Sequence, residues 1–404
     1  MLRLWRSERS ALILVTLTVL IDFIGFGLIY PIFPFWAEHI GANAFVIGLF
    51  IAVHALAQCM FMPILGMLSD RYGRRSIIIV TLLIETLSLI LTVLARNLLL
   101  LILARFIAGA GASRIGSAQT VVADVTLPQQ RTQGMGLLGA AFGVGMIIGP
   151  PLGGLLASIR ITLPFWVAAG VLLINALLVT LFLPETRKIA PMQTQILTAR
   201  ARWHILPTGW RKLYRSPAIT RLMAVDLLFA LAFATVISVF ALFTEHHFGW
   251  KAKQVGYTFT YLGIISVIMQ GGLIGWLAKR LGEQKLLLLG LCCLAGGLLA
   301  LSLSRSVAFM LLALGVLHVG EGVARPSITA LFSFASPADM EGETLGIAQG
   351  VGSLGNMIGP MLAGSCYLLA GSRIPFMTGG AFVVVAALLL LPPLPAIIRQ
   401  SVRT

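Results

Sequence analysis

Charged residues are scarce in this sequence. Asp, Glu, Lys and Arg make up 11% of its 404 residues, whereas 58% of the residues are hydrophobic. A soluble globule of this length needs less apolar surface for its core and more charge for its exterior. The composition therefore excludes an ordinary soluble protein and indicates a chain that crosses a membrane many times.

Cysteines are also few, and motifs for nucleotide hydrolysis or metal binding are missing. The four cysteines, Cys59, Cys292, Cys293 and Cys366, all lie in apolar runs, where packing is expected and a disulfide framework is not. The sequence contains no Gly-x4-Gly-Lys-Ser/Thr loop, and no metal-ligand cluster or serine-nucleophile motif stands out. We expect no enzyme, no metal and no cofactor, and any driving energy should come from an ion gradient.

Long apolar runs fill most of the chain. A helix needs about 20 apolar residues to cross the hydrocarbon core of a bilayer. The sequence predicts twelve such helical spans, at residues 11–35, 45–68, 76–95, 98–124, 133–157, 164–183, 218–244, 254–278, 285–304, 307–334, 343–368 and 374–396.

The net charge of +15 comes from basic residues that are unevenly placed. If the N-terminus is cytoplasmic, 20 of the 29 Lys and Arg residues fall in cytoplasmic segments, 6 in outside loops and 3 within spans. Lys and Arg accumulate in the cytoplasmic loops of membrane proteins. The charge therefore reflects topology rather than nucleic-acid binding, and it predicts that both termini are cytoplasmic.

The chain divides into two similar halves. The segment 66–75, GMLSDRYGRR, is matched 209 residues later by 275–284, GWLAKRLGEQ, and a Gly-Pro pair at 149–150 recurs 210 residues later. Parallel repeats of this kind are one architecture of secondary transporters. We expect an N-terminal six-helix bundle at 1–183, a cytoplasmic basic linker at 184–217 and a C-terminal six-helix bundle at 218–404.

Three motifs resemble those of the major facilitator superfamily. Its loop 2–3 signature is matched by Gly66, Asp70, Arg71, Gly73, Arg74 and Arg75. The span-five signature of its antiporter branch is matched by Gly143, Gly145, Gly149, Pro150, Gly153 and Gly154. The first span is similar to that of the drug:proton antiporters, and of tetracycline exporters in particular, at Asp22, Gly25, Gly27, Pro31 and Pro34.

The resemblance covers nearly the whole chain. It implies an all-α membrane protein with twelve transmembrane helices in two pseudo-symmetric six-helix bundles. It also implies a proton-coupled transporter that exports a small organic molecule by alternating access in a bacterial inner membrane. The expected partners are this substrate, protons and membrane lipid, and we expect a monomer.

Asp22 lies inside the first apolar run. An ionised carboxylate in a membrane interior is costly unless it is paired or hydrated, so such acids mark functional sites. Two interpretations stay open. Asp22 binds and releases a coupling proton, or it forms a static pair with Arg105 of span four, where the resemblance implies a basic partner. Both hold if protonation breaks the pair.

Span ten carries a polar stripe. His318, Glu321 and Arg325 are spaced i, i+3 and i+7, which places them on one helical face. Either Glu321 and Arg325 neutralise each other, or the three side chains line the substrate cavity. Arg114 lies nine residues after Arg105, on the opposite face of span four, and either contacts substrate or pairs with a buried acid.

Four further polar residues are weaker candidates. Asp226 in span seven is expected near the cytoplasmic mouth as a second proton carrier, and Glu85 in span three is either structural or faces the cavity. His54 and Gln58 in span two are i, i+4 neighbours that either line the cavity or form a buried hydrogen-bonded pair.

The resemblance also implies a cytoplasmic gate. In the family, the loop 2–3 residues bind the cytoplasmic ends of the two halves together in one state, and Asp124 resembles a part of that network. Contacts made in one state only bias a two-state equilibrium. In the second copy of this loop, at 275–284, the charge pattern is lost, because Lys279 and Glu283 stand in place of Asp70 and Arg74. The glycines of span five are expected to allow close approach between the halves.

One position departs from the tetracycline exporters. They carry an acid in span nine where this sequence has Leu294, so a second proton carrier must lie elsewhere, at Glu321, Asp226 or Glu85.

The substrate therefore stays open at this stage. A carboxylate-bearing metabolite such as a siderophore would suit Arg114 and Arg325. A proton symporter that imports an organic anion is a further alternative, although the span-five signature favours export. A non-transporting membrane receptor is the alternative from another class.

Overall fold

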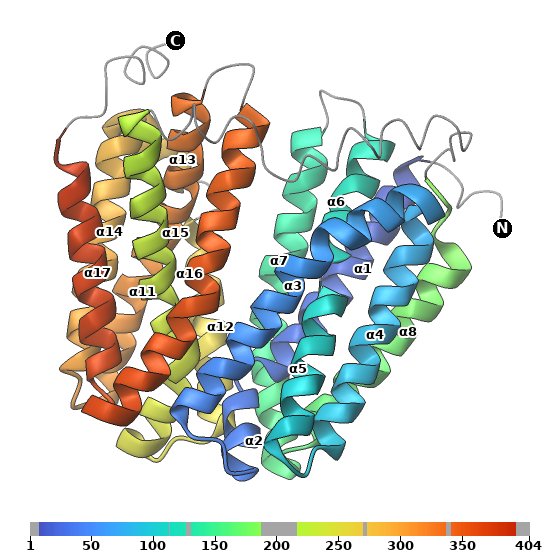
Figure 1. Cartoon of the computed structure of the whole chain (residues 1–404), viewed down its shortest axis with the longest axis horizontal. Helices are drawn as coiled ribbons and strands as arrows, with labels where there is room; N and C mark the ends of the chain where they lie inside the picture. The colour runs from blue at the N-terminus through green and yellow to red at the C-terminus, as the bar shows by residue number, and fades with distance from the viewer. Residues whose placement is uncertain are drawn as a thin grey trace. The chain divides into compact units, whose positions relative to one another are not determined.

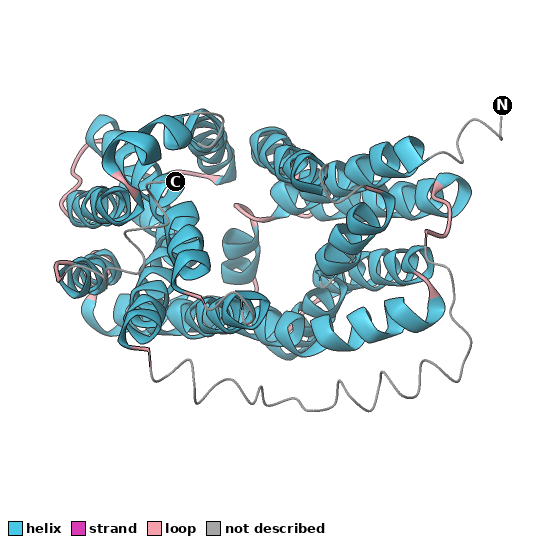
Figure 2. Ribbon diagram, turned by 90° about the horizontal axis from the view of Figure 1, so that it is seen from above, coloured by secondary structure: helices cyan, strands magenta, loops and turns pink. Residues whose placement is uncertain are grey.

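The computed structural model describes residues 8–112, 114–126, 131–186, 216–269, 273–336 and 341–392, and within these ranges the regular structure is entirely helical (Figures 1 and 2). The first eight helices are α1 (Glu8–Ile29), α2 (Phe33–His39), α3 (Ala44–Tyr72), α4 (Arg74–Leu94), α5 (Leu98–Ala112), α6 (Arg114–Val125), α7 (Arg131–Ile159) and α8 (Leu163–Phe182). The remaining helices are α11 (Pro217–Phe248), α12 (Ala252–Ile268), α13 (Ile274–Leu281), α14 (Glu283–Ser302), α15 (Val307–Ala335), α16 (Glu341–Ala370) and α17 (Ile374–Leu390).

Each predicted span contains helix in its described residues. In the described part of the chain, nine helices are long and apolar enough to cross a membrane, and α17 is a shorter apolar helix. Many large apolar side chains on these helices are exposed, among them Leu87, Leu103, Ile174 and Leu177. A helix that exposes apolar side chains along its length needs lipid around it, so the packing agrees with a membrane-embedded bundle.

The first predicted span is divided. The run expected as one span at 11–35 forms α1 and the short helix α2, with a turn at 30–32. Pro31 lies in this turn, and Pro34 lies in the first turn of α2, where the missing N–H of proline is tolerated. The prolines therefore end one helix and begin another, rather than bending a continuous one.

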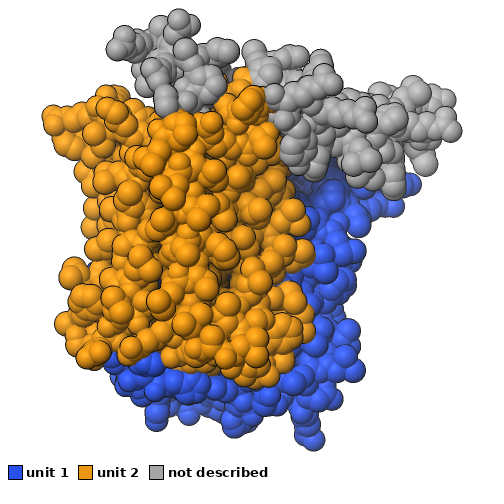
Figure 3. All heavy atoms as spheres, turned by 60° about the vertical axis from the view of Figure 1, so that its left-hand side comes forward, with its two compact units in different colours: residues 1–42, 50–202, 244–263 blue, residues 43–49, 203–243, 264–404 orange. Residues whose placement is uncertain are grey.

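The chain forms two compact units. One unit contains the described residues of 1–42, 50–202 and 244–263, and the other those of 43–49, 203–243 and 264–404 (Figure 3). The start of α3 thus groups with the second unit, whereas the end of α11 and most of α12 group with the first. Residues 187–215 of the predicted linker lie outside the described part, and the predicted bundle boundaries stay a prediction.

The internal repeat is visible in the backbone. Gly73 and Gly282, 209 residues apart, begin α4 and α14 with φ of 96° and 75°, a conformation that favours glycine. A Cβ added to Gly145 of α7 would lie 2.6 Å from Phe23 Cβ of α1, and one added to Gly355 of α16 would lie 2.5 Å from Ala230 Cβ of α11. The two crossings are equivalent, so α1 and α11 match at an offset of 207 residues.

The glycines of α7 were expected at the interface between the halves, and the structure places most of their contacts elsewhere. Gly145, Gly149 and Gly153 lie against the backbone of α1, and Gly154 lies against the start of α12. Glycine lets two helix backbones approach closely. Here that approach mainly joins α1 and α7 within one unit.

Candidate functional site

Arg105 is the centre of a polar cluster in the first unit, which we call the N-terminal polar site. Its guanidinium donates a hydrogen bond of 3.0 Å to Thr92 Oγ1 of α4 and lies 4.5 Å from the ring centroid of Phe33 on α2. Glu85, one-tenth exposed on α4, interacts electrostatically with Arg105. A cation over an aromatic face, with an acid nearby, is a stable way to hold a guanidinium in an apolar bundle.

Neighbouring contacts fix this site. Thr92 donates its hydroxyl to the Ser88 carbonyl at 2.7 Å, and its own carbonyl accepts from Trp36 Nε1 at 3.0 Å. Gly109 and Gly111 bring α5 close to α3 and α4, because a Cβ at either position would collide with the neighbouring backbone. The short helix α2 and the α4–α5 crossing therefore position Arg105 together.

His54 and Gln58 lie on α3 beside this site. Gln58 Nε2 donates to the carbonyl of Ala112 at 3.4 Å, and His54 Nδ1 is buried without a hydrogen-bond partner. Arg105 Nε is likewise buried without a partner. Two buried polar atoms that lack partners leave hydrogen-bonding capacity for a ligand.

Asp22 is buried on α1, with 6% of its surface exposed. The structure gives Glu85 as an acid that interacts with Arg105, a partner that the sequence did not indicate. The pairing of Asp22 with Arg105 stays a prediction. Arg114 begins α6, and its side chain lies outside the described part of the structure.

A second cluster, the C-terminal polar site, joins α11 and α15. Arg325 NH1 lies 3.5 Å from Asp226 Oδ1, and its guanidinium carbon lies 5.7 Å from the ring centroid of Phe229. Phe229 stacks parallel to Phe233 at 6.2 Å, and His318 meets Phe233 edge-on at 6.0 Å. An arginine, an acid and a row of rings therefore lie on adjoining faces of the two helices.

The two members of the Asp226–Arg325 pair differ in exposure. The Asp226 side chain is 6% exposed, whereas that of Arg325 is 48% exposed. A guanidinium in an apolar helix is favoured where polar groups can reach it, and the exposed side of Arg325 keeps hydrogen-bonding capacity for such groups. Arg325 also interacts electrostatically with Glu321. Glu321 was expected to neutralise Arg325. In the structure both acids interact with Arg325, and Asp226 makes the direct ion pair.

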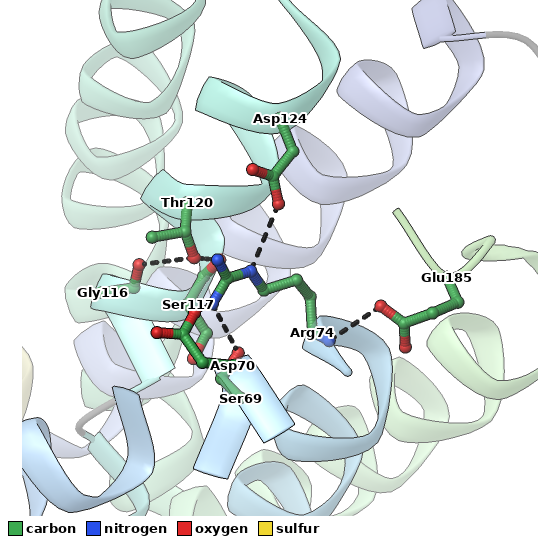
Figure 4. A network of polar contacts seen from close by, with 8 residues as sticks. All are labelled: Ser69, Asp70, Arg74, Gly116, Ser117, Thr120, Asp124 and Glu185. Atoms are coloured by element: carbon green, nitrogen blue, oxygen red, sulfur yellow. Dashed lines mark hydrogen bonds and ion pairs between the residues drawn. The ribbon is translucent and has the colours of Figure 1, made fainter. Parts of the chain in front are cut away.

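The predicted gate residues of the first unit gather around Arg74 (Figure 4). Its guanidinium lies 2.7 Å from Asp70 Oδ1 and 3.2 Å from Asp124 Oδ2, and it donates to Ser69 Oγ at 3.3 Å. Its backbone N–H donates to Glu185 Oε1 at 2.8 Å. One arginine therefore joins the ends of α3, α4 and α6 to the segment after α8.

Glu185 was not predicted as a functional residue from the sequence. The carboxylate accepts from the first N–H of α4, that of Arg74, at a helix terminus that favours negative charge. The only sequence signal was its place directly after span six, in Pro184-Glu185-Thr186. Gly73 is also required here, because a Cβ on it would collide with the Glu185 carboxylate.

The other loop 2–3 residues make simpler contacts. Arg75 donates to the carbonyl of Thr180 on α8, and Arg71 lies over the ring of Tyr72 at 5.3 Å. A Cβ on Gly66 would meet nothing within 4 Å. These contacts lie within the first unit, so a gate that acts between the halves stays a prediction.

Leu294 occupies the position where the resemblance led us to expect an acid. The side chain is fully buried in α14, and a Cβ on Gly320 of α15 would lie 2.5 Å from the Leu294 backbone nitrogen. This position packs one helix against another and leaves no space for a hydrated carboxylate.

A family model described as Major Facilitator Superfamily matches residues 15–307 and 271–401. The chain belongs to the Major Facilitator Superfamily. Its relatives in this superfamily include the tetracycline resistance protein, class C, of Escherichia coli, which is 30% identical over 98% of each chain. Multidrug resistance protein 2 of Bacillus subtilis is 30% identical over 94% of each chain.

Solved structures give the same architecture. The chain resembles the crystal structure of a D-xylose-proton symporter with a TM-score of 0.77. The two are 16% identical, and the match covers 97% of this chain and 99% of that one. At this identity the likeness concerns the fold alone. The chain is thus an all-α integral membrane transporter of the superfamily, with two pseudo-symmetric six-helix bundles, and the expected fold is confirmed.

Proposed function

We propose that the protein exports a small organic molecule in exchange for protons by alternating access. Two relatives that match nearly the whole chain are named for tetracycline resistance and multidrug resistance. The observation that carries the proposal is the Asp226–Arg325 ion pair, a buried acid beneath a half-exposed guanidinium. Such a pair responds both to protons and to a charged solute.

Protonation changes the pair in a defined way. When the Asp226 carboxylate takes up a proton, its attraction to Arg325 is lost and the guanidinium is free to bind another anion or to move. The Glu85 and Arg105 charges in the N-terminal polar site respond in the same manner. Each half of the transporter thus carries one proton-sensitive acid and arginine.

Asp22 remains the first candidate for the transported proton. Its burial in α1 makes the charged form unfavourable, which is the condition for proton binding in a membrane interior. We assign Glu85, Asp226 and Glu321 as further carriers, and Arg105 as the counter-charge in the first unit. His54, Gln58, His318 and Arg325 are the proposed substrate contacts.

The C-terminal polar site favours a substrate with a flat ring and an acidic group. Phe233 offers a partly exposed ring, stacked on the buried Phe229, and the exposed side of Arg325 offers paired N–H donors for a carboxylate. This observation supports a second candidate function, export of a carboxylate-bearing metabolite such as a siderophore.

A whole-cell accumulation assay tests export and substrate class together. Cells that express the protein should accumulate less of a transported compound than cells without it, and a proton uncoupler should abolish the difference. The panel should contain tetracycline, other drugs and carboxylate-bearing metabolites, each tested also with Arg325→Gln. No change in accumulation for any compound would argue against export.

Topology and assembly are further parts of the proposal. We propose a bacterial inner-membrane location, cytoplasmic termini and a monomeric transporter. Reporter fusions at both ends, active only in the cytoplasm, test the orientation. Light scattering of the purified protein tests the monomer.

A further inference from the structure

Two glutamates from different parts of the chain meet in the first unit. Glu38 lies on α2 and Glu245 near the end of α11, and their carboxyl groups are hydrogen-bonded to each other. His246 Nε2 lies 3.5 Å from Glu38 Oε1. The charge distribution of the sequence places both glutamates at the outer end of the spans.

The two glutamates are equivalent positions of the internal repeat. They are 207 residues apart, which is the offset at which Phe23 and Ala230 match in α1 and α11. Histidine follows each of them in the sequence. The repeat has therefore placed two copies of one helix end against each other.

The local backbone repeats as well. The carbonyl of Glu38 accepts from the N–H of Gly41 at 2.8 Å, and that of Glu245 accepts from the N–H of Gly249 at 2.9 Å. Both glycines have positive φ, of 95° and 63°. Each glutamate is thus held by a similar helix end, and its side chain is presented by a fixed backbone.

A contact between two carboxyl groups has a chemical requirement. Ionised carboxylates accept hydrogen bonds and donate none, and two of them repel each other. The hydrogen bond therefore needs one proton shared by the pair. Glu245 Oε2 is buried, so a negative charge on it is poorly solvated and a doubly ionised pair is disfavoured.

Other charged groups near this end are basic. They include His39, which stacks on Trp36 of α2, His246 and His247 on α11, Lys251 before α12 and Lys253 in its first turn, Arg96 and Arg160 in the expected outside loops, and Arg105, which lies over Phe33. Of these, His246 contacts the pair directly. A protonated His246 would attract an ionised Glu38, but it does not replace the proton that the carboxyl–carboxyl hydrogen bond requires.

Each glutamate belongs to an anchored segment. On the α2 side, Trp36 donates to the Thr92 carbonyl of α4 at 3.0 Å and packs against Phe165 of α8. The α11 segment continues through Thr244, whose carbonyl accepts from the N–H of Trp250 at 3.2 Å. A bond between the two glutamates therefore joins structured elements rather than loose ends.

We propose that Glu38 and Glu245 form a proton-dependent latch, in which one shared proton holds the outer ends of the first and seventh spans together. Loss of that proton separates the two ends. The inference rests on the proposed transport function for its physiological meaning. The latch takes up and releases its proton on the outer side of the membrane. No proton crosses the membrane through it, so the latch responds to external pH and does not drive transport.

Distance measurement by pulsed electron paramagnetic resonance tests the latch. Cys59, Cys292, Cys293 and Cys366 are replaced by serine, and spin labels are placed at Arg96→Cys and Lys251→Cys, two exposed positions on the expected outer side. The purified full-length protein is measured in acidic and in alkaline buffer without substrate. We expect a short distance in acid and an additional longer distance in alkali.

Variants separate the latch from other pH effects. Glu38→Gln and Glu245→Gln replace the shared proton by a permanent amide donor, so each should keep the short distance in both buffers. Glu245→Lys should do the same through an ion pair with Glu38. Arg305→Gln, which removes an exposed charge from an outside loop, should respond to pH like the parent protein.

Two outcomes overturn the latch. One is a parent protein whose distances do not change with pH. The other is a pair of Gln variants that still respond to pH like the parent. Because no substrate is present, these outcomes do not depend on transport, and a failure of the export assay would leave this measurement intact.

Discussion

Gly111 of α5 and Gly320 of α15 occupy the same place in two copies of one helix crossing. A Cβ on Gly111 would lie 3.0 Å from both the Thr81 carbonyl oxygen and the Glu85 nitrogen of α4. A Cβ on Gly320 would lie 2.6 Å and 2.5 Å from the matching backbone atoms of α14, those of Gly290 and Leu294. All matching pairs are 209 residues apart. The repeat therefore preserves backbone contacts while the polar side chains around them differ.

The tight crossing predicts an effect on stability. Gly320→Ala should destabilise the protein by about 1–3 kcal/mol, because the added methyl group overpacks a helix–helix contact. Gly275→Ala is a suitable control, since a Cβ there would meet nothing within 4 Å. The apparent melting temperature in detergent measures both variants. Equal melting temperatures for the two would contradict the close packing.

The repeat also predicts how the N-terminal polar site tolerates change. Leu294 and Leu314 of the second half stand where the first half has Glu85 and Arg105, and both leucines are fully buried. We therefore expect the double variant Glu85→Leu/Arg105→Leu to fold and to lose transport. Glu85→Leu alone should destabilise by about 3–5 kcal/mol, because it leaves a buried guanidinium uncompensated.

Size-exclusion profiles, melting temperatures and transport rates distinguish these outcomes. A double variant that transports normally would show that the pair is structural only. A single variant as stable as the double variant would show that Glu85 does not compensate Arg105.

The Asp226–Arg325 pair predicts a coupled effect in the second half. Arg325→Gln should lower stability by about 1–3 kcal/mol, less than for a fully buried pair, because the guanidinium is half-exposed. Adding Asp226→Asn should recover most of this loss but not transport. A double-mutant cycle of melting temperatures measures the interaction. Additive effects of the two changes would argue against a direct interaction.

The contact between Glu185 and the first N–H of α4 predicts a smaller effect. Glu185→Ala should cost about 0.5–2 kcal/mol, the range for loss of a helix N-cap, and Glu185→Gln should cost less because an amide oxygen still accepts. Hydrogen exchange of the first turn of α4 measures the loss directly. Unchanged exchange in Glu185→Ala would show that this contact does not hold the helix terminus.

Much of the fold was predictable because its signals are local or periodic. Apolar runs indicate helices in a membrane, and the matching segments 66–75 and 275–284 indicate a repeat. The glycines that begin α4 and α14 could be found at one offset, because only glycine readily adopts their positive φ.

Side-chain partners were less predictable, because sequence gives the face of a helix but not the neighbour it meets. Arg105 interacts with Glu85, a partner that the sequence did not indicate, and Arg325 pairs directly with Asp226 across two helices. Glu185 was missed because its partner is a backbone N–H of α4. Every residue type except proline carries such a group, so the sequence of α4 does not point to the contact.

Proton movement in liposomes tests the central claim most directly. Purified protein is placed in liposomes with an acidic lumen and an internal pH dye, and a panel of drugs and carboxylate-bearing metabolites is added outside. Proton-coupled exchange predicts that the internal pH rises when a transported compound enters, and that Asp22→Asn abolishes this rise. Entry of a compound with no change in internal pH, or with a fall, would contradict the account.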